Sequence, residues 1–201
     1  MFNPNTMRIS KKLALLSLLF FTSFCHLYAQ EKEKKVSPVR LLIKGAFEFG
    51  GDDVAEVYFT NGEKQSVKAG QGVSIAVGGE FQMPSVEKLL FHATVGYKYV
   101  TTQADNANIR MTRVPIQVTA NWMATKKLRL GAGVATHQAI RFKADGLGED
   151  ITFDGATGPT FEVAYSVIGL TYTPMTYKDQ DKHTYSANAI GVSLTFSLPK
   201  R

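Results

Sequence analysis

The residues from Tyr185 to Leu198 carry the pattern that most constrains the fold of this chain. Small or polar residues alternate there with larger, mostly apolar ones. The small or polar set is Ala187, Ala189, Gly191, Ser193 and Thr195, and the other set is Asn188, Ile190, Val192, Leu194, Phe196 and Leu198. Successive side chains of a β-strand point to opposite faces of its sheet, so a period of two predicts a strand. One face of that strand must meet an apolar environment, and the other must not.

The same period of two recurs from Val39 onward, between segments rich in turn-forming residues. No apolar stretch reaches the length of a membrane helix, which is about 20 residues. Pro115 and Pro174 each remove a hydrogen-bond donor from a strand, which predicts a bulge or a strand end there. The sequence therefore predicts an all-β fold of eight strands, near residues 39–49, 73–83, 89–100, 110–122, 128–141, 159–167, 169–178 and 185–198.

The connections between these strands alternate in length. Residues 84–88 and 123–127 are short, whereas 50–70, 101–109, 145–158 and 179–183 are longer or more polar. Membrane barrels have short periplasmic turns and longer outer loops, so this alternation predicts an antiparallel up-and-down barrel. In the first long loop, Asn61-Gly62 is a strong hairpin signal. We expect that hairpin to extend the first two strands beyond the membrane.

The N-terminal residues predict where the protein goes. Arg8, Lys11 and Lys12 precede a long apolar run, and Ala29 offers a small residue for cleavage. This order is typical of a secretory signal peptide, so we expect residues 1–29 to be removed and residues 30–38 to form a charged leader. Cleavage would lower the formal net charge from +6 to +3 and remove Cys25, the only cysteine. Neither nucleic-acid binding nor a cysteine metal site is then expected.

The period of two alone does not tell a soluble barrel from a membrane barrel, because it does not say which face is inside. Two observations favour apolar faces that point outward into lipid. The polar faces are rich in Gly, Ala, Ser and Thr, which suits the narrow interior of an eight-stranded barrel. Aromatic residues lie near strand ends on the apolar faces, as interfacial girdles require: Phe49, Phe81, Tyr97, Tyr99, Trp122, Phe142 and Phe196. We predict a transmembrane barrel of residues 39–198.

The chain also resembles a known family, the small bacterial outer-membrane β-barrel proteins of the OmpA-like and OmpX-like type. The resemblance covers Val39–Leu198 and includes Ala69-Gly70-Gln71-Gly72 and residues 172–177. Residues 189–196 are similar to the family's C-terminal assembly signal, with Gly191 as the fixed glycine and Leu194 and Phe196 as the terminal hydrophobes. The family has a polar residue where Ala189 stands. The resemblance implies an outer-membrane location, contact with outer-membrane lipid, and recognition by the barrel-assembly machinery.

Charged residues on the polar faces are expected to converge inside the barrel. They are Arg40, Lys44, Glu48, Glu80, Lys98, Arg113, Arg129, Arg141 and Glu162. Eight strands leave an interior just wide enough for side chains, and buried charges must pair or stay hydrated. We therefore predict a lumen plugged by ion pairs and hydrogen bonds. The alternative is a narrow channel for small solutes.

Enzymatic chemistry is not predicted. Some small outer-membrane barrels modify lipid A, and such chemistry needs a serine activated by a histidine and an acid. His92 and His137 are both expected to face the interior, and no Gly-x-Ser-x-Gly elbow surrounds Ser74 or Ser193. A lipid A-modifying enzyme is therefore the least favoured alternative.

The long loops offer no metal or cofactor motif. Glu149, Asp150 and Asp154 cluster in one of them, but they lack the spacing of a calcium loop. Loops nevertheless carry most binding functions of such barrels. We expect a structural role or a surface-interaction role, with residues 50–70 and 145–158 as the places where an external ligand would bind.

Overall fold

The computed structural model describes residues 37–58, 64–104, 107–146 and 148–199, and the structural statements below concern these residues. The signal peptide expected at residues 1–29 lies outside them, as does all of the expected leader except Ser37 and Pro38. Within the described residues, no helix is long and apolar enough to cross a membrane.

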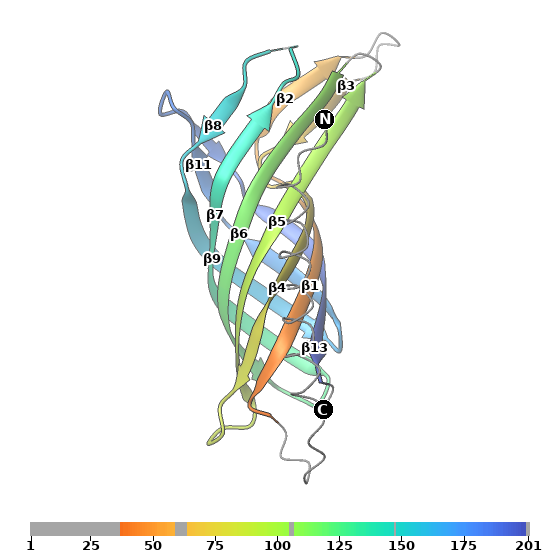
Figure 1. Cartoon of the computed structure of the whole chain (residues 1–201), viewed down its shortest axis with the longest axis vertical. Helices are drawn as coiled ribbons and strands as arrows, with labels where there is room; N and C mark the ends of the chain where they lie inside the picture. The colour runs from red at the N-terminus through yellow and green to blue at the C-terminus, as the bar shows by residue number, and fades with distance from the viewer. Residues whose placement is uncertain (1–36, 59–63, 105–106, 147, 200–201) are drawn as a thin grey trace, which may run out of the picture. The chain divides into compact units, whose positions relative to one another are not determined.

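Eight strands of the described chain form a closed antiparallel barrel (Figure 1). Each pairs with its neighbours along the chain, and the last strand pairs with the first. In order around the ring they are β1 (Val39–Phe49), β4 (Gly72–Gln82), β5 (Leu89–Ala104), β6 (Ala107–Met123), β7 (Leu128–Lys143), β9 (Ala156–Tyr165), β10 (Ile168–Thr173) and β13 (Ala189–Leu198). The predicted eight-stranded up-and-down barrel is confirmed.

The closing seam joins β1 to β13, which lie side by side in Figure 1. Leu194 pairs with Gly45 and Phe196 with Ile43, while Gly191 pairs with Glu48. A Cβ atom at position 191 would lie 2.6 Å from the carbonyl oxygen of Phe47. A larger residue at position 191 would therefore clash with the backbone of β1, which explains the glycine in the alternating pattern.

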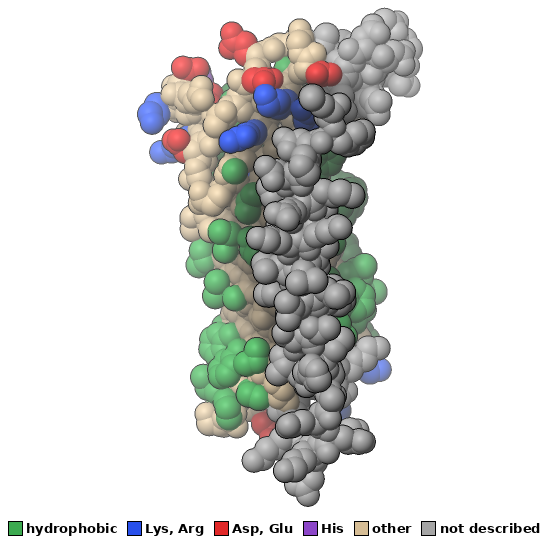
Figure 2. All heavy atoms as spheres, viewed as in Figure 1, with side chains coloured by type: hydrophobic (Ala, Val, Ile, Leu, Met, Phe, Trp, Pro, Cys, Tyr) green, Lys and Arg blue, Asp and Glu red, His purple; other side chains and the backbone are tan. Residues whose placement is uncertain are grey.

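The barrel wall is apolar on the outside. The outward side chains that are about half exposed form an apolar belt, which we define by Phe47, Ile75, Val95, Val118, Val134, Val163, Leu170, Ile190, Leu194 and Phe196. Figure 2 shows hydrophobic side chains along the wall and charged side chains gathered at the upper end. The alternate residues point inward, where Glu80, Lys98 and Arg113 are almost completely buried. This inside-out arrangement confirms the prediction that the apolar faces point outward, as in a barrel surrounded by lipid.

Smaller elements lie at one end of the barrel, which is uppermost in Figure 1 and is called the upper end. The hairpin of β2 (Asp53–Tyr58) and β3 (Lys64–Lys68) and that of β11 (Thr176–Lys178) and β12 (Thr184–Ser186) each form their own two-stranded sheet. β8 (Ile151–Phe153) pairs with the upper part of β7. Among the described residues, the strand connections at the lower end are short turns, such as Ser166-Val167 between β9 and β10.

The Asn61-Gly62 signal correctly predicted a hairpin, whose tip at residues 59–63 lies outside the described residues. The expectation that it extends β1 and β4 was wrong, because β2 and β3 form a separate sheet. The chain changes direction at Gly70, which is packed against another loop. A Cβ atom there would lie 2.5 Å from the carbonyl oxygen of Asn188. Gly50 and Gly51, whose φ values are 117° and 86°, separate β1 from β2, and the turn at Ala69 and Gly70 separates β3 from β4.

Both prolines mark irregularities, as predicted. Pro174 separates β10 from β11, and Pro115 lies next to a register shift in the pairing of β6 with β7. β7 contributes the extra residue of this bulge around Ala139, whose φ is 50°. One extra residue exchanges the two faces of a strand. Beyond Ala139 the direction of every side chain on β7 is therefore reversed.

The bulge corrects two predictions about β7. Arg141 is exposed on the outside and does not join the charged residues of the interior. Phe142 is only 3% exposed and points inward, so it does not belong to an outer aromatic girdle. Both assignments had assumed an uninterrupted period of two through residues 137–142.

Candidate functional site

The lowest group of interior charges surrounds Glu80. Its carboxylate forms an ion pair with Arg40, its Oε2 atom lies 3.1 Å from Nε2 of His92, and the Ser197 hydroxyl donates to Oε2 at 2.8 Å. Arg40, Glu80 and His92 occupy paired positions on the neighbouring strands β1, β4 and β5. The strand register alone therefore brings these three side chains together.

A second group is built around Glu162 of β9, and its partner Lys44 lies four positions beyond Arg40 along β1. One carboxylate oxygen of Glu162 lies 2.5 Å from Nζ of Lys44, and the other lies 2.5 Å from Nη2 of Arg129. Gln117 accepts from Lys44 at 3.2 Å and donates to the hydroxyl of Thr160 at 3.1 Å. Lys44 and Glu162 lie on β1 and β9, which are not neighbouring strands, so this group crosses the interior. One carboxylate here pairs with two cations, so the group as a whole keeps a charge of +1.

The third group fixes the connection between β3 and β4 to the barrel. Lys98 forms an ion pair with Glu48 at 2.8 Å and donates to the carbonyl oxygen of Gly70 at 2.7 Å. Arg113 is fully buried and donates to the carbonyl oxygens of Ala69 and Gln71. These two cations therefore satisfy backbone carbonyls that would otherwise be buried without donors.

A small polar cavity lies at the level of the second and third groups. It has a volume of about 50 Å³ and is lined by Lys44, Glu48, Thr94, Gln117 and His137, among others. Since one water needs about 10–15 Å³ of such volume, the cavity has room for about four water molecules. A cavity of this size has room for water beside the neighbouring charges and does not by itself form a continuous pore.

Apolar side chains fill the interior above these groups and form the upper apolar core. They come from β3, β5, β6, β7, β8, β9 and β11 and from residues next to β3, β7, β11 and β12. The core consists of Val67, Ala69, Val100, Ile109, Met111, Ala135, Ile140, Phe142, Ala144, Phe153, Ala156, Met175, Tyr177 and Ala187. Tyr177 also links this core to the polar interior, because its hydroxyl lies 2.5 Å from Nδ1 of His137. The upper hairpins thus fold onto the barrel end and cover it with a packed core.

The structure places eight of the nine predicted interior charges inside the barrel, in the three groups above. Arg141 is the one that lies outside. Sequence reasoning did not identify the polar partners Gln117, Thr160 and Ser197. It also did not identify the upper apolar core. Val100 and Met111 carried a weak signal for that core, since both interrupt the polar side of an alternating segment.

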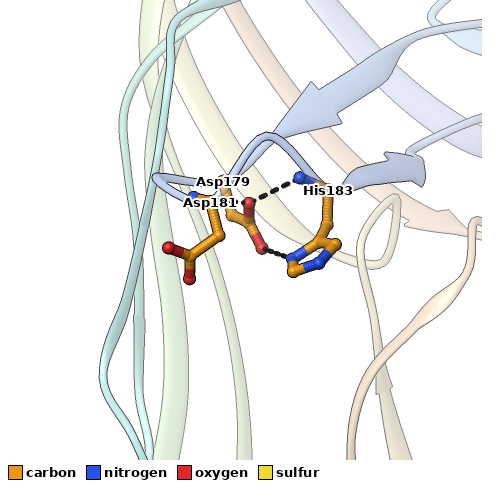
Figure 3. A group of neighbouring side chains, drawn as sticks. All are labelled: Asp179, Asp181 and His183. Atoms are coloured by element: carbon orange, nitrogen blue, oxygen red, sulfur yellow. Dashed lines mark hydrogen bonds and ion pairs between the residues drawn. The ribbon is translucent and has the colours of Figure 1, made fainter.

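A cluster of possible metal ligands lies in the turn between β11 and β12, where Asp179, Asp181 and His183 approach one another (Figure 3). The Oδ1 atom of Asp179 accepts the backbone N–H groups of Asp181 at 3.0 Å and His183 at 2.8 Å. Its Oδ2 atom lies 3.1 Å from Nδ1 of His183, whereas the carboxylate of Asp181 points away from both (Figure 3).

The electrostatics of this turn follow from the same contacts. Burial acts to raise the pKa of Asp179, but hydrogen bonds from the backbone and side chain of His183 outweigh it, so the pKa is lowered overall. Both carboxylate oxygens are already engaged in closing the turn. The contacts therefore assign Asp179 a structural role in shaping the β11–β12 hairpin.

Comparison with solved structures finds other small barrels. Neisserial surface protein A shares 13% identity with this chain at a TM-score of 0.42, over 80% of this chain and 98% of the other. Ail of Yersinia pestis, the attachment invasion locus protein, solved in complex with the heparin analogue sucrose octasulfate, shares 8% identity at a TM-score of 0.43, over 79% and 97%. No protein-family model and no curated protein sequence matches this chain. The fold assignment rests on the strand pairing described above.

Proposed function

We propose that this chain is a bacterial outer-membrane protein with a sealed barrel, whose role is structural or is carried out by the surface at its upper end. The observation that carries the proposal is the filling of the interior. Paired charges occupy its lower part, and the upper apolar core lies above them. A solute crossing the barrel would have to displace both.

The apolar belt supports the membrane location. β1 is 11 residues long, which agrees with the length of about 9–11 residues for a tilted transmembrane strand. Above the belt the outward residues of β7 become polar, as at Gln138, Arg141 and Lys143. The belt therefore has a limited height, as a protein surrounded by a bilayer requires.

The distribution of loops supports an orientation with the upper end outside the cell. Outer-membrane barrels have short turns on the periplasmic side and longer loops outside. In this chain the β2–β3 and β11–β12 hairpins and β8 all lie at the upper end, and short turns join the strands at the lower end. Any external partner would accordingly meet the upper hairpins first.

The only described grouping of a serine, a histidine and an acid in the lower interior is the group around Glu80, and its geometry does not favour the enzyme alternative. A serine nucleophile needs a histidine placed to accept its proton. In the group around Glu80, the carboxylate lies between the Ser197 hydroxyl and His92. The serine proton is donated to the carboxylate, and the histidine is not placed to take it.

Conductance of the pure protein tests the proposal against the narrow-channel alternative. Refolded protein is added to a planar lipid bilayer, and its insertion is verified in parallel by co-sedimentation with vesicles and by heat-dependent gel migration. We expect no current steps above the protein-free background, because the charged groups are paired and the upper apolar core excludes ions. A large porin prepared in the same detergent is the positive control. Reproducible steps from correctly folded protein would overturn the sealed barrel and favour the channel.

A further inference from the structure

The upper end of the barrel carries a cleft of about 650 Å³. The cleft lies between β2, the loop before β8 and the turn between β11 and β12. Its lining is completed by Ile109 of β6, Phe142 of β7, and Ala144, which follows β7 directly. Binding sites for ligands commonly have volumes of about 300–1,000 Å³. An inference about this cleft rests on the proposed function, because it requires the upper end to face the outside.

The floor of the cleft is apolar. It is formed by Val54, Ala55, Ile109, Phe142, Ala144, Ile151 and Tyr185. Ile109, Phe142 and Ala144 belong to the upper apolar core, and the other four pack against it. The floor is therefore supported from below by a packed core. A surface of this kind offers a favourable place for an apolar side chain of a partner.

The rim of the cleft is acidic. It contains Glu56, Glu149, Asp150, Asp179 and Asp181, and the described lining residues include His183 but no lysine or arginine. This asymmetry is confined to the lining, because the upper end also carries basic residues such as Lys68 and Lys178, and Lys143 contacts the rim at Asp150.

Part of this rim is held in place by its own contacts. The Asp150 carboxylate is 2.8 Å from Nζ of Lys143 and also accepts the backbone N–H of Ala144 at 3.0 Å. These hydrogen bonds, that from Lys143 first, lower the pKa of Asp150. Asp179 is fixed by the turn described above. The acidic rim is thus arranged before any partner arrives.

We propose that this cleft binds a cationic amphipathic peptide segment, in which an apolar side chain rests on the floor and flanking lysine or arginine side chains lie against the acidic rim. Charge complementarity selects this occupant, because the described lining has five acidic residues and no lysine or arginine, and an anionic ligand would meet the exposed carboxylates of Glu149 and Asp181. A bare metal ion would leave the apolar floor unused. An apolar ligand without charge would gain nothing from the rim.

Fluorescence anisotropy with labelled peptides tests the inference. The protein is reconstituted in phosphatidylcholine nanodiscs, and the probe is a five-residue peptide that alternates lysine with leucine and phenylalanine. Two matched peptides serve as comparisons, one with glutamate in place of lysine and one with serine in place of the apolar residues. Empty nanodiscs measure adsorption to lipid. We expect saturable binding of the first peptide only.

Two variants locate the binding. Gly148→Trp adds a large side chain at the cleft wall, where a Cβ atom would lie 3.6 Å from that of Ala144 and so fits without a clash. We expect it to remove saturable binding. The double variant Glu149→Gln, Asp181→Asn removes two exposed rim charges. Each of the two substitutions is expected to raise the Kd of the peptide by up to about fivefold. The control variant Glu87→Gln with Asp154→Asn removes the same charge outside the cleft and should leave Kd unchanged.

The possible outcomes separate the inference from the proposed function. If all variants migrate as folded, heat-modifiable barrels and the cationic amphipathic peptide does not bind, the inference is wrong and the proposed function stands. Equal binding of the lysine–serine peptide, or binding that Gly148→Trp does not alter, would also overturn it. Protein that fails the folding and insertion assays would instead count against the proposed function.

Discussion

Replacing Leu194 and Phe196 together with aspartate is expected to abolish assembly of the barrel in the membrane. Both side chains point outward from β13 within the apolar belt, where they are 45% and 46% exposed. A charged side chain on the lipid face of a barrel costs up to about 2–4 kcal/mol, somewhat less for aspartate. The resemblance to outer-membrane barrels also implies that these two residues are the terminal hydrophobes of an assembly signal. We therefore expect the double substitution to lower the stability of the closing strand in lipid and, if residues 189–196 act as an assembly signal, its recognition as well.

The measurement is heat-dependent gel migration of protein recovered from the membrane fraction. A matched variant carries Thr152→Asp and Thr184→Asp, which place the same charges on exposed positions of β8 and β12, outside the apolar belt. We expect the matched variant to assemble normally. Normal amounts of heat-modifiable protein from the Leu194→Asp, Phe196→Asp variant would contradict the assignment of β13 to the lipid face.

The second large effect is expected at Glu162. This carboxylate is shared by Lys44 and Arg129, and all three side chains are largely buried. Glu162→Gln keeps the volume but leaves two cations in the interior without their acid. Removing one partner of a buried ion pair costs about 3–5 kcal/mol, because the remaining charge is uncompensated. We expect a loss of that order in the free energy of unfolding.

Urea unfolding in detergent micelles, followed by tryptophan fluorescence, measures this loss. Adding Lys44→Met to Glu162→Gln removes one of the two uncompensated cations and should restore part of the stability. Asp53→Asn removes an exposed partner of Lys68 and should change stability by less than about 1 kcal/mol. A Glu162→Gln barrel as stable as the wild type would mean that the interior is well hydrated and that its charges do not depend on one another.

The barrel could be predicted from the sequence because lipid and a narrow interior impose opposite demands on alternate residues. The predicted strand 39–49 coincides with β1, and Leu41, Phe47 and Phe49 point outward as their alternation indicates. The Arg40–Glu80 pair follows from the same logic, since the two residues are neighbours in register. Local periodicity therefore determines which side chains enter the interior.

The features that could not be predicted depend on single backbone positions or on distant contacts. The bulge at Ala139 reverses the faces of β7, and an alanine with positive φ has no sequence signature. The pairing of Lys44 with Glu162 joins non-neighbouring strands across the interior. The upper apolar core forms only because β3 and β11 fold back onto β5, β6 and β7. None of these contacts is encoded in a period of two.

Trp122 offers the most direct test of the central claim that the apolar belt faces lipid. It is the only tryptophan of the chain, it points outward, and it lies near the lower end of the belt, paired with Leu89 and Leu130. The protein is reconstituted in vesicles of phosphatidylcholine brominated either near the headgroup or near the bilayer centre. We expect quenching of Trp122 fluorescence by both lipids, stronger with bromine near the headgroup. Equal fluorescence in brominated and unbrominated vesicles, from protein that is folded and inserted, would contradict the account.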